Sequence, residues 1–387
     1  MYQINCLNKI SPIGTDRFGS NYNVGTDVAN PDAIMVRSAA MHDMEFNDNL
    51  LAIARAGAGT NNIPIDRCSE QGIVVFNTPG ANANAVKELV LAGLFLTSRK
   101  IVPGINWAKG LKGNGAEVGK MVEKGKSQFV GPEIKGKTLG VIGLGAIGVL
   151  VANAALALGM DVYGYDPYLS VNAAWNLERS IKHAASLDEI YANSDYITLH
   201  LPLTPDTKGM IGAETIAKMK DGVRILNFAR GDLADTPALI AALGEGKVAA
   251  YVTDFPNDEL LDVENVLPIP HLGASTPESE DNCASMAADE LIDYLENGNI
   301  TNSVNFPNVS MPRDDSTRLS ILHKNMPNIL SQLTTTFGEK GLNIENMQSK
   351  SKKDNAYALL DVKGDIGDDI VAAIKAVDGV IAVRVIK

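Results

Sequence analysis

Histidine, cysteine and basic residues are all scarce in this sequence. The 387 residues include five histidines and three cysteines, and 34 Lys and Arg stand against 46 Asp and Glu, which gives a formal net charge of −12. A protein that binds nucleic-acid phosphates needs a basic surface, so we expect no nucleic-acid partner. The cysteines, Cys6, Cys68 and Cys283, are odd in number and far apart. We therefore expect no disulfide framework and no metal site.

Long apolar runs are missing as well. The most apolar stretch, 89–96, has eight residues, whereas a membrane-spanning helix needs roughly 20. The first ten residues lack the basic segment and apolar core of a secretory signal. These absences favour a cytoplasmic protein with no membrane partner. The length predicts two or three domains.

Short strands alternate with helices over most of the chain, which is typical of parallel α/β sheets. In the first hundred residues we expect strands at 33–36, 51–54 and 73–76 and a long helix at 83–98. The segment 101–137 is rich in lysine and glycine and is predicted to be a solvated, irregular connection. From 138 to 254 six strands separated by helices predict a doubly wound nucleotide-binding domain.

The remainder of the chain has a different pattern. A second long helix is expected at 276–296, followed by a linker rich in Asn, Pro and Ser. From 318 onward the order of strands and helices is βαββαβ, which is ferredoxin-like. We therefore expect this tail to be a separate small domain.

A glycine fingerprint follows the first strand of the doubly wound domain. The segment 141–148, VIGLGAIG, places Gly143 at a tight turn, Gly145 beside the pyrophosphate and Gly148 against the strand. The helix that opens at Ala146 and Ile147 would direct its N–H groups toward the anion.

An acidic residue supports the fingerprint. Asp166 ends the next strand, 18 residues after Gly148, close to the roughly 20-residue spacing of the acid that binds the adenosine ribose. No Arg or Lys follows in 166–168 to receive a 2′-phosphate. NAD is therefore favoured over NADP as the cofactor.

Three residues near strand ends meet the needs of hydride transfer between nicotinamide and an alcohol or ketone. Arg230 could hold a substrate carboxylate, and Glu259 could orient the imidazole of His271, which would act as acid or base. The residue types alone equally allow a surface arginine and a capping histidine. His42 and His183 are expected to be solvated, and His200 is expected to be a satisfied core or cofactor-edge group.

These residues resemble the NAD-dependent D-2-hydroxyacid dehydrogenase family. The resemblance covers nearly the whole chain and depends on the glycine fingerprint with Asp166, on NFARGDLADTPALIAALGEGKVAAYVTDF, on PHLGASTPES and on the βαββαβ tail. It is greatest to the branch that oxidises 3-phosphoglycerate and carries a C-terminal ACT regulatory domain. It implies that Arg230, Glu259 and His271 are the catalytic residues.

The family pattern also assigns cofactor contacts. It places Asp254 at the nicotinamide carboxamide. The further NAD contacts that it implies are Ala146, Ile147, Pro202, Phe228, Ala229, Gly273 and Ala274. The chain departs from the pattern because Phe255 directly follows Asp254 and no proline follows Glu259. Asp258 is therefore a rival partner for His271, although a glutamate has the longer reach.

The resemblance extends to substrate and effector residues. VRSAA and RAGAGTNNI place Arg37 and Arg55 at the phosphate end of the substrate, and the remaining substrate contacts would be Ala56, Gly57 and Asn77. In the tail, His323, Asn325 and Asn343 match the serine-binding pattern between paired ACT domains. Asn328 stands where the family has glycine, and Asn tolerates a left-handed backbone.

The expected architecture is an α/β protein in three parts. A doubly wound Rossmann NAD domain (95–275) is inserted in a flavodoxin-like substrate domain (1–94 and 276–303), and a linker (304–317) leads to a ferredoxin-like ACT domain (318–387). We expect NAD-dependent oxidation of 3-phosphoglycerate in serine biosynthesis, with L-serine as an effector of a homodimer or homotetramer. The alternatives are a dehydrogenase of another D-2-hydroxy acid and a non-enzymatic, NAD-binding corepressor-like protein.

Overall fold

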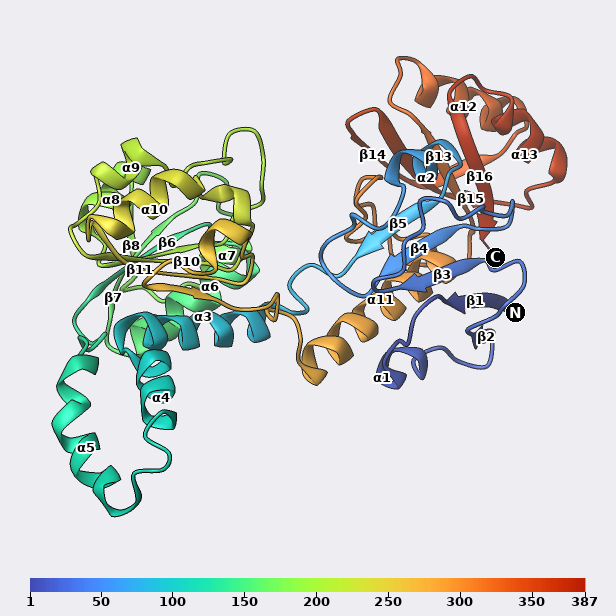
Figure 1. Ribbon diagram of the computed structural model, residues 1–387. Coiled ribbons are helices and arrows are strands. Elements are labelled where there is room, and N and C mark those ends of the chain that lie inside the picture. Colours follow the sequence, from blue (N-terminus) through green and yellow to red (C-terminus); the bar gives the residue numbers. More distant parts are fainter. Residues whose placement is uncertain (387) are drawn as a thin grey trace. The chain divides into compact units, whose positions relative to one another are not determined.

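The computed structural model describes residues 1–386, and the chain divides into two compact units. The first unit combines Met1–Asn82 with Pro277–Lys387, and the second is Ala83–Thr276 (Figure 1). Each unit has its own parallel sheet, and the first also has an antiparallel one. Among the described residues, no helix is long and apolar enough to cross a membrane.

The parallel sheet of the first unit has five strands in the order β2-β1-β3-β4-β5. The strands are β1 (Tyr2–Cys6), β2 (Tyr22–Gly25), β3 (Ala33–Val36), β4 (Ala52–Arg55) and β5 (Val74–Asn77). Short helices α1 (Pro12–Thr15) and α2 (Ile65–Glu70) lie between them. This strand order confirms the predicted flavodoxin-like fold. The central strands are buried on both faces, which is why their sequences are continuously apolar.

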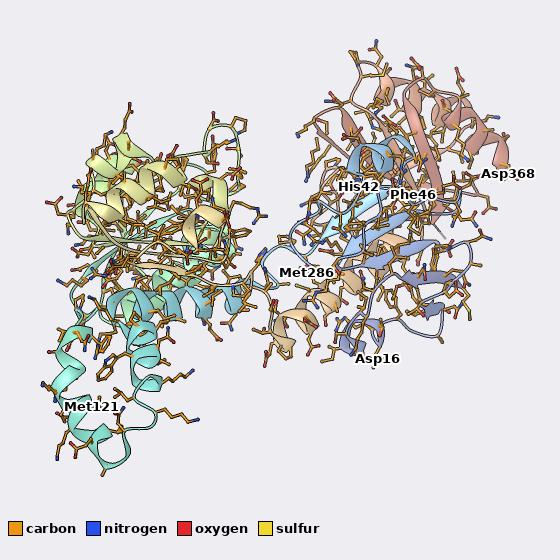
Figure 2. The ribbon with its side chains drawn as sticks, viewed as in Figure 1. Asp16, His42, Phe46, Met121, Met286 and Asp368 are labelled. Carbon is orange, nitrogen blue, oxygen red and sulfur yellow. The ribbon has the colours of Figure 1, made fainter. Side chains whose placement is uncertain are left out.

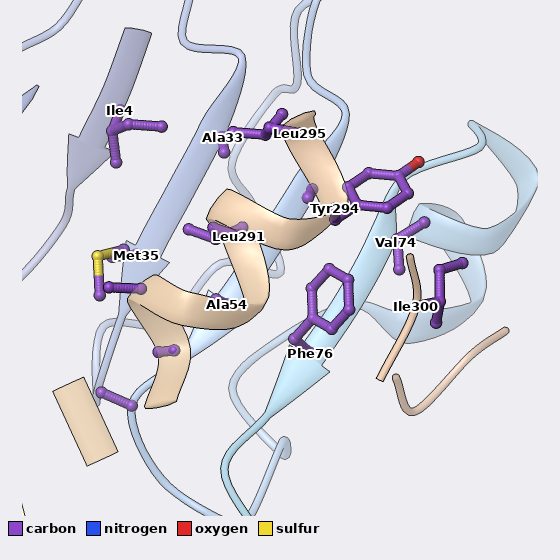
Figure 3. Close-up of a cluster of buried hydrophobic side chains, with 14 of the residues drawn as sticks. Ile4, Ala33, Met35, Ala54, Val74, Phe76, Leu291, Tyr294, Leu295 and Ile300 are labelled. Carbon is purple, nitrogen blue, oxygen red and sulfur yellow. The ribbon is translucent and has the colours of Figure 1, made fainter. Parts of the chain in front are cut away.

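Helix α11 (Pro277–Asn297) packs across this sheet and forms the core of the first unit. Leu291, Tyr294 and Leu295 of α11 are buried against the strands (Figure 3). The rings of Phe76 and Tyr294 lie 5.7 Å apart in a tilted arrangement. Full burial of a large apolar side chain contributes about 1.5–3 kcal/mol, so this helix is a main source of stability for the sheet.

The segment 300–309, which we call the strap, runs back along the sheet after α11. It forms an antiparallel bridge to β5 at Ser303, and the Asn305 side chain accepts the backbone N–H of Val75 at 2.9 Å. Phe306 is fully buried in the same core. The strap therefore belongs to the packed first unit, although the sequence there is rich in polar residues.

Glu290 is a buried carboxylic acid on α11. Its Oε1 accepts a hydrogen bond from the side chain of Asn302 at 2.7 Å, and its Oε2 has no hydrogen-bond partner among the described residues. Burial raises the pKa of Glu290 to about 8, partly opposed by the Asn302 hydrogen bond. The side chain is therefore mostly protonated at neutral pH.

Replacement of Glu290 should change how stability depends on pH. Between about pH 4.5 and about 8 the unfolded chain loses a proton that folded Glu290 retains, so the folded state loses stability as pH rises through this window. Glu290→Gln should match the wild type near pH 4.5 and exceed it at pH 8 by roughly 3–5 kcal/mol, since one pKa unit corresponds to about 1.4 kcal/mol. Urea unfolding at both pH values measures this, with Glu278→Gln on the same helix as control. A difference that does not vary with pH would contradict the prediction.

The antiparallel sheet of the first unit has the order β14-β15-β13-β16. Its elements are β13 (Thr317–Lys324), α12 (Ile329–Glu339), β14 (Asn343–Lys352), β15 (Asn355–Lys363), α13 (Asp368–Lys375) and β16 (Val380–Ile386). This confirms the ferredoxin-like βαββαβ order. One face packs against α12 and α13, and residues of the other face, such as Leu322, Tyr357 and Leu359, join the core around α11.

A buried ion pair ties the antiparallel sheet to the end of α11. Arg318 and Asp361 are 0% and 1% exposed, and two parallel bonds of 2.6 and 2.8 Å join them. The remaining guanidinium N–H groups donate to the carbonyls of Asn297, Met311 and Pro312. Every donor of the guanidinium is thus satisfied, as burial of a charge requires.

The second unit contains a parallel sheet of seven strands in the order β12-β11-β10-β9-β6-β7-β8. The strands are β6 (Thr138–Ile142), β7 (Asp161–Tyr165), β8 (Lys182–His183), β9 (Tyr196–Leu199), β10 (Val223–Asn227), β11 (Val248–Thr253) and β12 (Val266–Pro268). The helices around it are α3 (Ala83–Ser98), α6 (Ala146–Ala157), α7 (Val171–Trp175), α8 (Leu187–Asn193), α9 (Ala213–Ala217) and α10 (Thr236–Gly244). Strands β6 to β11 have the doubly wound order, which confirms the predicted Rossmann fold.

A helical arm, residues 101–129, extends from the second unit. It consists of α4 (Ile101–Lys109), η1 (Gly115–Glu117), α5 (Val118–Gly125) and η2 (Lys126–Phe129). Figure 2 shows Met121 on α5 away from the sheet. The prediction of an irregular connection was wrong for this segment, although it is exposed as expected. The rings of Trp107 and Phe129, 5.3 Å apart, join the two legs of the arm.

Candidate active site

The candidate residues of the second unit follow the carboxyl ends of its strands. Because these strands run parallel, their carboxyl ends share one edge of the sheet. Six of the strands are each followed by a loop that carries candidate residues at that edge. These loops are 143–147 after β6, Asp166 after β7, 200–202 after β9, 228–230 after β10, 254–259 after β11 and 271–274 after β12. The strand order reverses between β6 and β9, which is where doubly wound sheets bind dinucleotides.

The glycine loop between β6 and α6 has the shape that a pyrophosphate site needs. Gly143 has φ +92°, and a Cβ there would lie 2.5 Å from the carbonyl oxygen of His200. A Cβ on Gly148 would lie 1.9 Å from the carbonyl oxygen of Gly143. The space beside Gly145, at the start of α6, is open to 4 Å. Ala146 and Ile147 begin the helix, whose N–H groups can bind an anion there.

Asp166 is bonded to this loop. Its Oδ2 accepts the backbone N–H of Leu144 at 2.9 Å, and its Oδ1 accepts that of Tyr168 at 2.8 Å. A carboxylate has about four acceptor sites, so two remain for ribose hydroxyls. Asp166 therefore fits the adenosine ribose and also holds the glycine loop in place.

Asp254 is buried, with 2% of its surface exposed, directly after β11. Neither of its carboxylate oxygens has a hydrogen-bond partner among residues 1–386. Burial raises its pKa, while the charge of His271, the nearby backbone N–H of Gly273 and the charge of Arg230 oppose that rise. A buried acceptor without a donor is uncommon. The N–H of a nicotinamide carboxamide would satisfy it, so the residues present fit NAD.

Asn227 shapes the loop that carries Arg230. Its side-chain amide donates to the backbone carbonyl of Arg230 at 2.9 Å and to the hydroxyl of Tyr251 at 3.1 Å, and its Oδ1 accepts the N–H of Ala229 at 3.3 Å. Asn227 is fully buried at the end of β10. The backbone of the loop that carries Arg230 is therefore held by the hydrogen bonds of Asn227, while the Arg230 guanidinium is exposed.

Phe255 is close to both candidate catalytic side chains. Its ring centroid is 4.5 Å from that of His271, and the guanidinium carbon of Arg230 is 5.8 Å from the Phe255 centroid. Glu259 and Asp258 are both exposed on a 3-10 turn, η4 (Asp258–Leu260). Within the described chain, neither carboxylate pairs with His271. In this structure the His271 ring contacts Phe255, and both Glu259 and Asp258 stay candidates for its carboxylate partner.

The other cofactor candidates of the second unit lie in the same strand-end loops. Pro202 is exposed, Ala229 and Ala274 are half-buried, and Phe228 and Gly273 are buried. His200 bonds through Nε2 to the Thr198 hydroxyl at 3.0 Å. Burial lowers the pKa of His200 to about 4, so its ring is neutral at neutral pH. This agrees with the expectation of a satisfied group rather than a base.

In the first unit, Arg37 and Arg55 lie at the carboxyl ends of neighbouring strands. Arg55 pairs in register with Val36, and its Nε donates to the carbonyl oxygen of Arg37 at 2.9 Å. The Arg37 guanidinium forms an ion pair of 2.6 Å with Glu280 at the start of α11. The two arginines thus stand at neighbouring strand ends, with Arg55 bonded to the backbone of Arg37, and a carboxylate partly neutralises the Arg37 guanidinium.

The glycine loop after β4 connects this pair to Asn77. Ala56 is buried, Gly57 has φ +155°, and the Asn77 side chain donates to the carbonyl of Ala58 at 2.5 Å. Arg55 and Asn77 are paired in register on β4 and β5. All five substrate candidates are therefore at one edge of the first sheet.

Within one chain, the three effector candidates lie at two opposite ends of the antiparallel sheet. His323, the penultimate residue of β13, pairs with Ala356. Its Nδ1 lies 2.8 Å from the Lys324 carbonyl oxygen, and its buried Nε2 has no partner in the described residues. Burial lowers the pKa of His323. Asn325 bonds to the Lys353 carbonyl in the neighbouring hairpin. Asn343, however, pairs with Lys363 at the opposite end of β15, roughly 23 Å away at the usual rise per residue. Asn328 has φ +64°, the left-handed backbone expected of it.

Sequence reasoning missed three residues that shape the site. Asn227 and Phe255 had no assigned role, although both stand inside the quoted motifs, and Glu280 follows PHLGASTPES directly. The available signal for Asn227 was a polar residue at the end of an apolar strand. For Phe255 it was the departure from the family spacing.

The comparisons with known proteins agree with this geometry. Residues 95–273 match the family model described as "D-isomer specific 2-hydroxyacid dehydrogenase, NAD binding domain". The D-3-phosphoglycerate dehydrogenase of Haemophilus influenzae is 35% identical over 355 residues, which cover 89% of this chain and 83% of that protein. This chain belongs to the D-2-hydroxyacid dehydrogenase family. It is an NAD-dependent dehydrogenase.

Further relatives agree with this assignment. The Escherichia coli K12 D-3-phosphoglycerate dehydrogenase is 35% identical over 352 residues, with 88% of this chain and 82% of that protein covered. An NAD⁺-bound 3-phosphoglycerate dehydrogenase structure from Entamoeba histolytica has a TM-score of 0.58 and 27% identity, covering 79% of this chain and 98% of that one. A glyoxylate reductase from Paecilomyes thermophila has a TM-score of 0.64 and 26% identity, covering 78% and 98%.

Proposed function

We propose that this enzyme oxidises D-3-phosphoglycerate to 3-phosphohydroxypyruvate in the cytoplasm, and catalyses the reverse reduction, as the first step of L-serine biosynthesis. The observation that carries the proposal is the adjacent pair Arg37 and Arg55. Guanidinium groups bind phosphate oxygens well. In a chain of net charge −12, the cations for a doubly anionic substrate must be placed locally. The names of the relatives support the same substrate.

The chemistry that bound NAD would supply here is a nicotinamide acceptor for the hydride of the substrate's C2. The glycine loop would hold its pyrophosphate, Asp166 its ribose and Asp254 its carboxamide. Pro202, Phe228, Ala229, Gly273 and Ala274 would complete the pocket around it. Two observations support these roles: the space beside Gly145 is open, and the Asp254 carboxylate has no hydrogen-bond partner among the described residues.

Arg230 and His271 would carry the rest of the chemistry. The Arg230 guanidinium would hold the substrate carboxylate and polarise the C2 oxygen. The His271 imidazole would take the proton of the C2 hydroxyl in oxidation and return it to the carbonyl in reduction. Glu259 would orient the imidazole after a shift of its turn, with Asp258 as the alternative.

A panel of 2-oxo acids tests this assignment. NADH oxidation should be much faster with 3-phosphohydroxypyruvate than with pyruvate, hydroxypyruvate or 2-oxoglutarate. Faster turnover of an unphosphorylated acid would show that this acid, and not the phosphorylated one, is the substrate. No turnover of any of them, with NAD still bound, would leave only an NAD-binding protein of the same fold.

Removing the two arginines should affect the phosphorylated substrate selectively. The Arg37→Ala and Arg55→Ala double variant should raise KM for 3-phosphohydroxypyruvate by roughly 10–100-fold, since each charge-assisted hydrogen bond contributes about 1.5–3 kcal/mol. KM for hydroxypyruvate should change little. Steady-state kinetics on both substrates measures this, with Arg17→Ala as the control because Arg17 pairs with Asp289 on the surface. Equal losses on both substrates would show that the arginines do not bind the phosphate.

We further propose that L-serine is an effector and that the enzyme is a homodimer or homotetramer. His323 and Asn325 lie at one end of the antiparallel sheet and Asn343 at the other. A ligand that contacts all three therefore needs two chains, with the exposed edge strand β14 near the contact. The bare Nε2 of His323 is an acceptor that a ligand could satisfy.

L-Serine should lower the activity of the wild type, and Asn343→Ala should weaken that effect about tenfold, the factor expected for the loss of one hydrogen bond to a ligand. Activity against L-serine concentration, together with sedimentation velocity, measures both claims. Gln348→Ala, on the same strand, is the control. A wild type that is monomeric, or an Asn343→Ala variant with an unchanged serine response, would contradict the proposed site.

A further inference from the structure

A hollow of about 620 Å³ lies within the first unit, between the strap and the end of β14. Lys350, Ser351 and Lys352 of β14 line one side, and Asn302 and Asn308 of the strap line the other. Asn77, at the end of β5, also lines it. The volume falls in the range of small-molecule sites.

The electrostatic character of this hollow is basic. None of the residues that line it is acidic, although the whole chain carries a net charge of −12. Lys350 and Lys352 alternate on β14, so they lie on the same face of the strand. Across the described residues, neither forms an ion pair with a carboxylate. Burial, and then the charge of Lys353, lowers the pKa of Lys352.

The hollow also has unused hydrogen-bond donors. The side chain of Asn308 makes no hydrogen bond in the described part of the chain. The Lys352 ammonium donates to the Ser303 carbonyl at 2.7 Å, which fixes its position and leaves two N–H groups. Two ammonium groups and an amide therefore line one open hollow.

We propose that this hollow is a binding site for a small anion with a phosphate group, held by Lys350, Lys352 and Asn308. Lysine binds phosphate as a point charge, and the Asn308 amide supplies further donors. No part of this site includes Arg37 or Arg55. It shares only Asn77 with the substrate candidates, so phosphate binding here does not rest on the substrate proposed above.

The wall of the hollow is bonded to the substrate candidates of the first sheet. The backbone N–H of Asn77 donates to the Asn302 carbonyl at 3.4 Å, and the Asn77 side chain donates to the Ala58 carbonyl in the glycine loop. An anion in the hollow contacts the same strap. We therefore expect its binding to change KM for the 2-oxo acid more than kcat.

Calorimetric titration of the full chain with inorganic phosphate, and separately with glycerol 2-phosphate, at constant ionic strength tests the site. Lys350→Gln with Lys352→Gln should raise the Kd at least about tenfold, a loss of about 1.4 kcal/mol. Glutamine keeps an N–H for the Ser303 carbonyl, so the strand should stay folded. Lys340→Gln with Lys375→Gln, an equal charge change in the same unit, should leave the Kd within about twofold, since surface substitutions usually have small effects. The Arg37→Ala and Arg55→Ala variant should retain the binding.

The two titrants distinguish the sources of the phosphate group. Tighter binding of glycerol 2-phosphate supports a phosphorylated metabolite, and equal binding supports free phosphate. No binding of either to the wild type overturns the proposal. Equal weakening in the lysine pair and its control also overturns it, because the effect would then be one of net charge. Loss only in the arginine variant would assign the binding to the substrate site.

Discussion

His271→Ala should lower kcat by about 10²–10⁴-fold in both directions, the usual contribution of a general acid–base group. His271 is exposed and contacts Phe255, so its removal should leave the fold and NAD affinity unchanged. Stopped-flow or steady-state NADH kinetics, together with NADH fluorescence titration, separate turnover from cofactor binding. His183→Ala, an exposed histidine on β8, is the control. Unchanged turnover would remove His271 as the acid or base.

The same kinetics can identify the partner of His271. Neither Glu259 nor Asp258 contacts the imidazole in this structure, so its orientation depends on Phe255 and on whichever carboxylate approaches when substrate binds. Catalytic hydrogen bonds are often long before the substrate complex forms. Glu259→Gln should lower kcat more than Asp258→Asn does. The reverse order would make Asp258 the partner.

Asp361→Ala should destabilise the first unit by about 3–5 kcal/mol, because it leaves the fully buried guanidinium of Arg318 without a counter-charge. Urea unfolding followed by circular dichroism measures the loss. The effect should exceed that of any surface pair, since exposed ion pairs such as Lys340 with Asp369 contribute about 0–1 kcal/mol.

Removing both charges is the matched control. Arg318→Met combined with Asp361→Leu should recover most of the stability, because buried ion pairs can often be replaced by apolar residues of similar volume at little cost. If the double variant were as unstable as Asp361→Ala, the carbonyl contacts of Arg318 to Asn297, Met311 and Pro312 would be the important ones.

The sequence was most informative where local pattern and tertiary structure agree. The predicted helix 83–98 has the same bounds as α3, and the predicted strand 33–36 the same as β3. β1 was missed although its sequence, YQINC, alternates apolar and polar residues, because five residues are a short window for such a pattern. The helical arm was missed because lysine and glycine dominate its sequence. The Trp107–Phe129 contact that joins its legs spans 22 residues, which no local pattern reveals.

In the candidate site, too, the residues that belong to a local sequence pattern could be predicted, and those that depend on tertiary contacts could not. Gly143, Gly145, Gly148 and Asp166 form a fingerprint with fixed spacing, so their places after β6 and β7 could be predicted. The role of Asn227 depends on a bond to Tyr251 of the neighbouring strand, and that of Phe255 depends on His271 after another strand. Such contacts are set by how strands pair, which a single sequence does not specify.

The core around α11, which both sheets of the first unit share, makes deletion of the C-terminal antiparallel sheet costly. Leu322, Tyr357 and Leu359 of the antiparallel sheet lie in the same cluster as Phe76 of the first sheet and Phe306 of the strap. A stop codon soon after the strap would leave that apolar surface in water, where it favours aggregation. Evolution toward an enzyme without this tail would therefore require compensating changes in α11 and the strap as well as loss of the final residues.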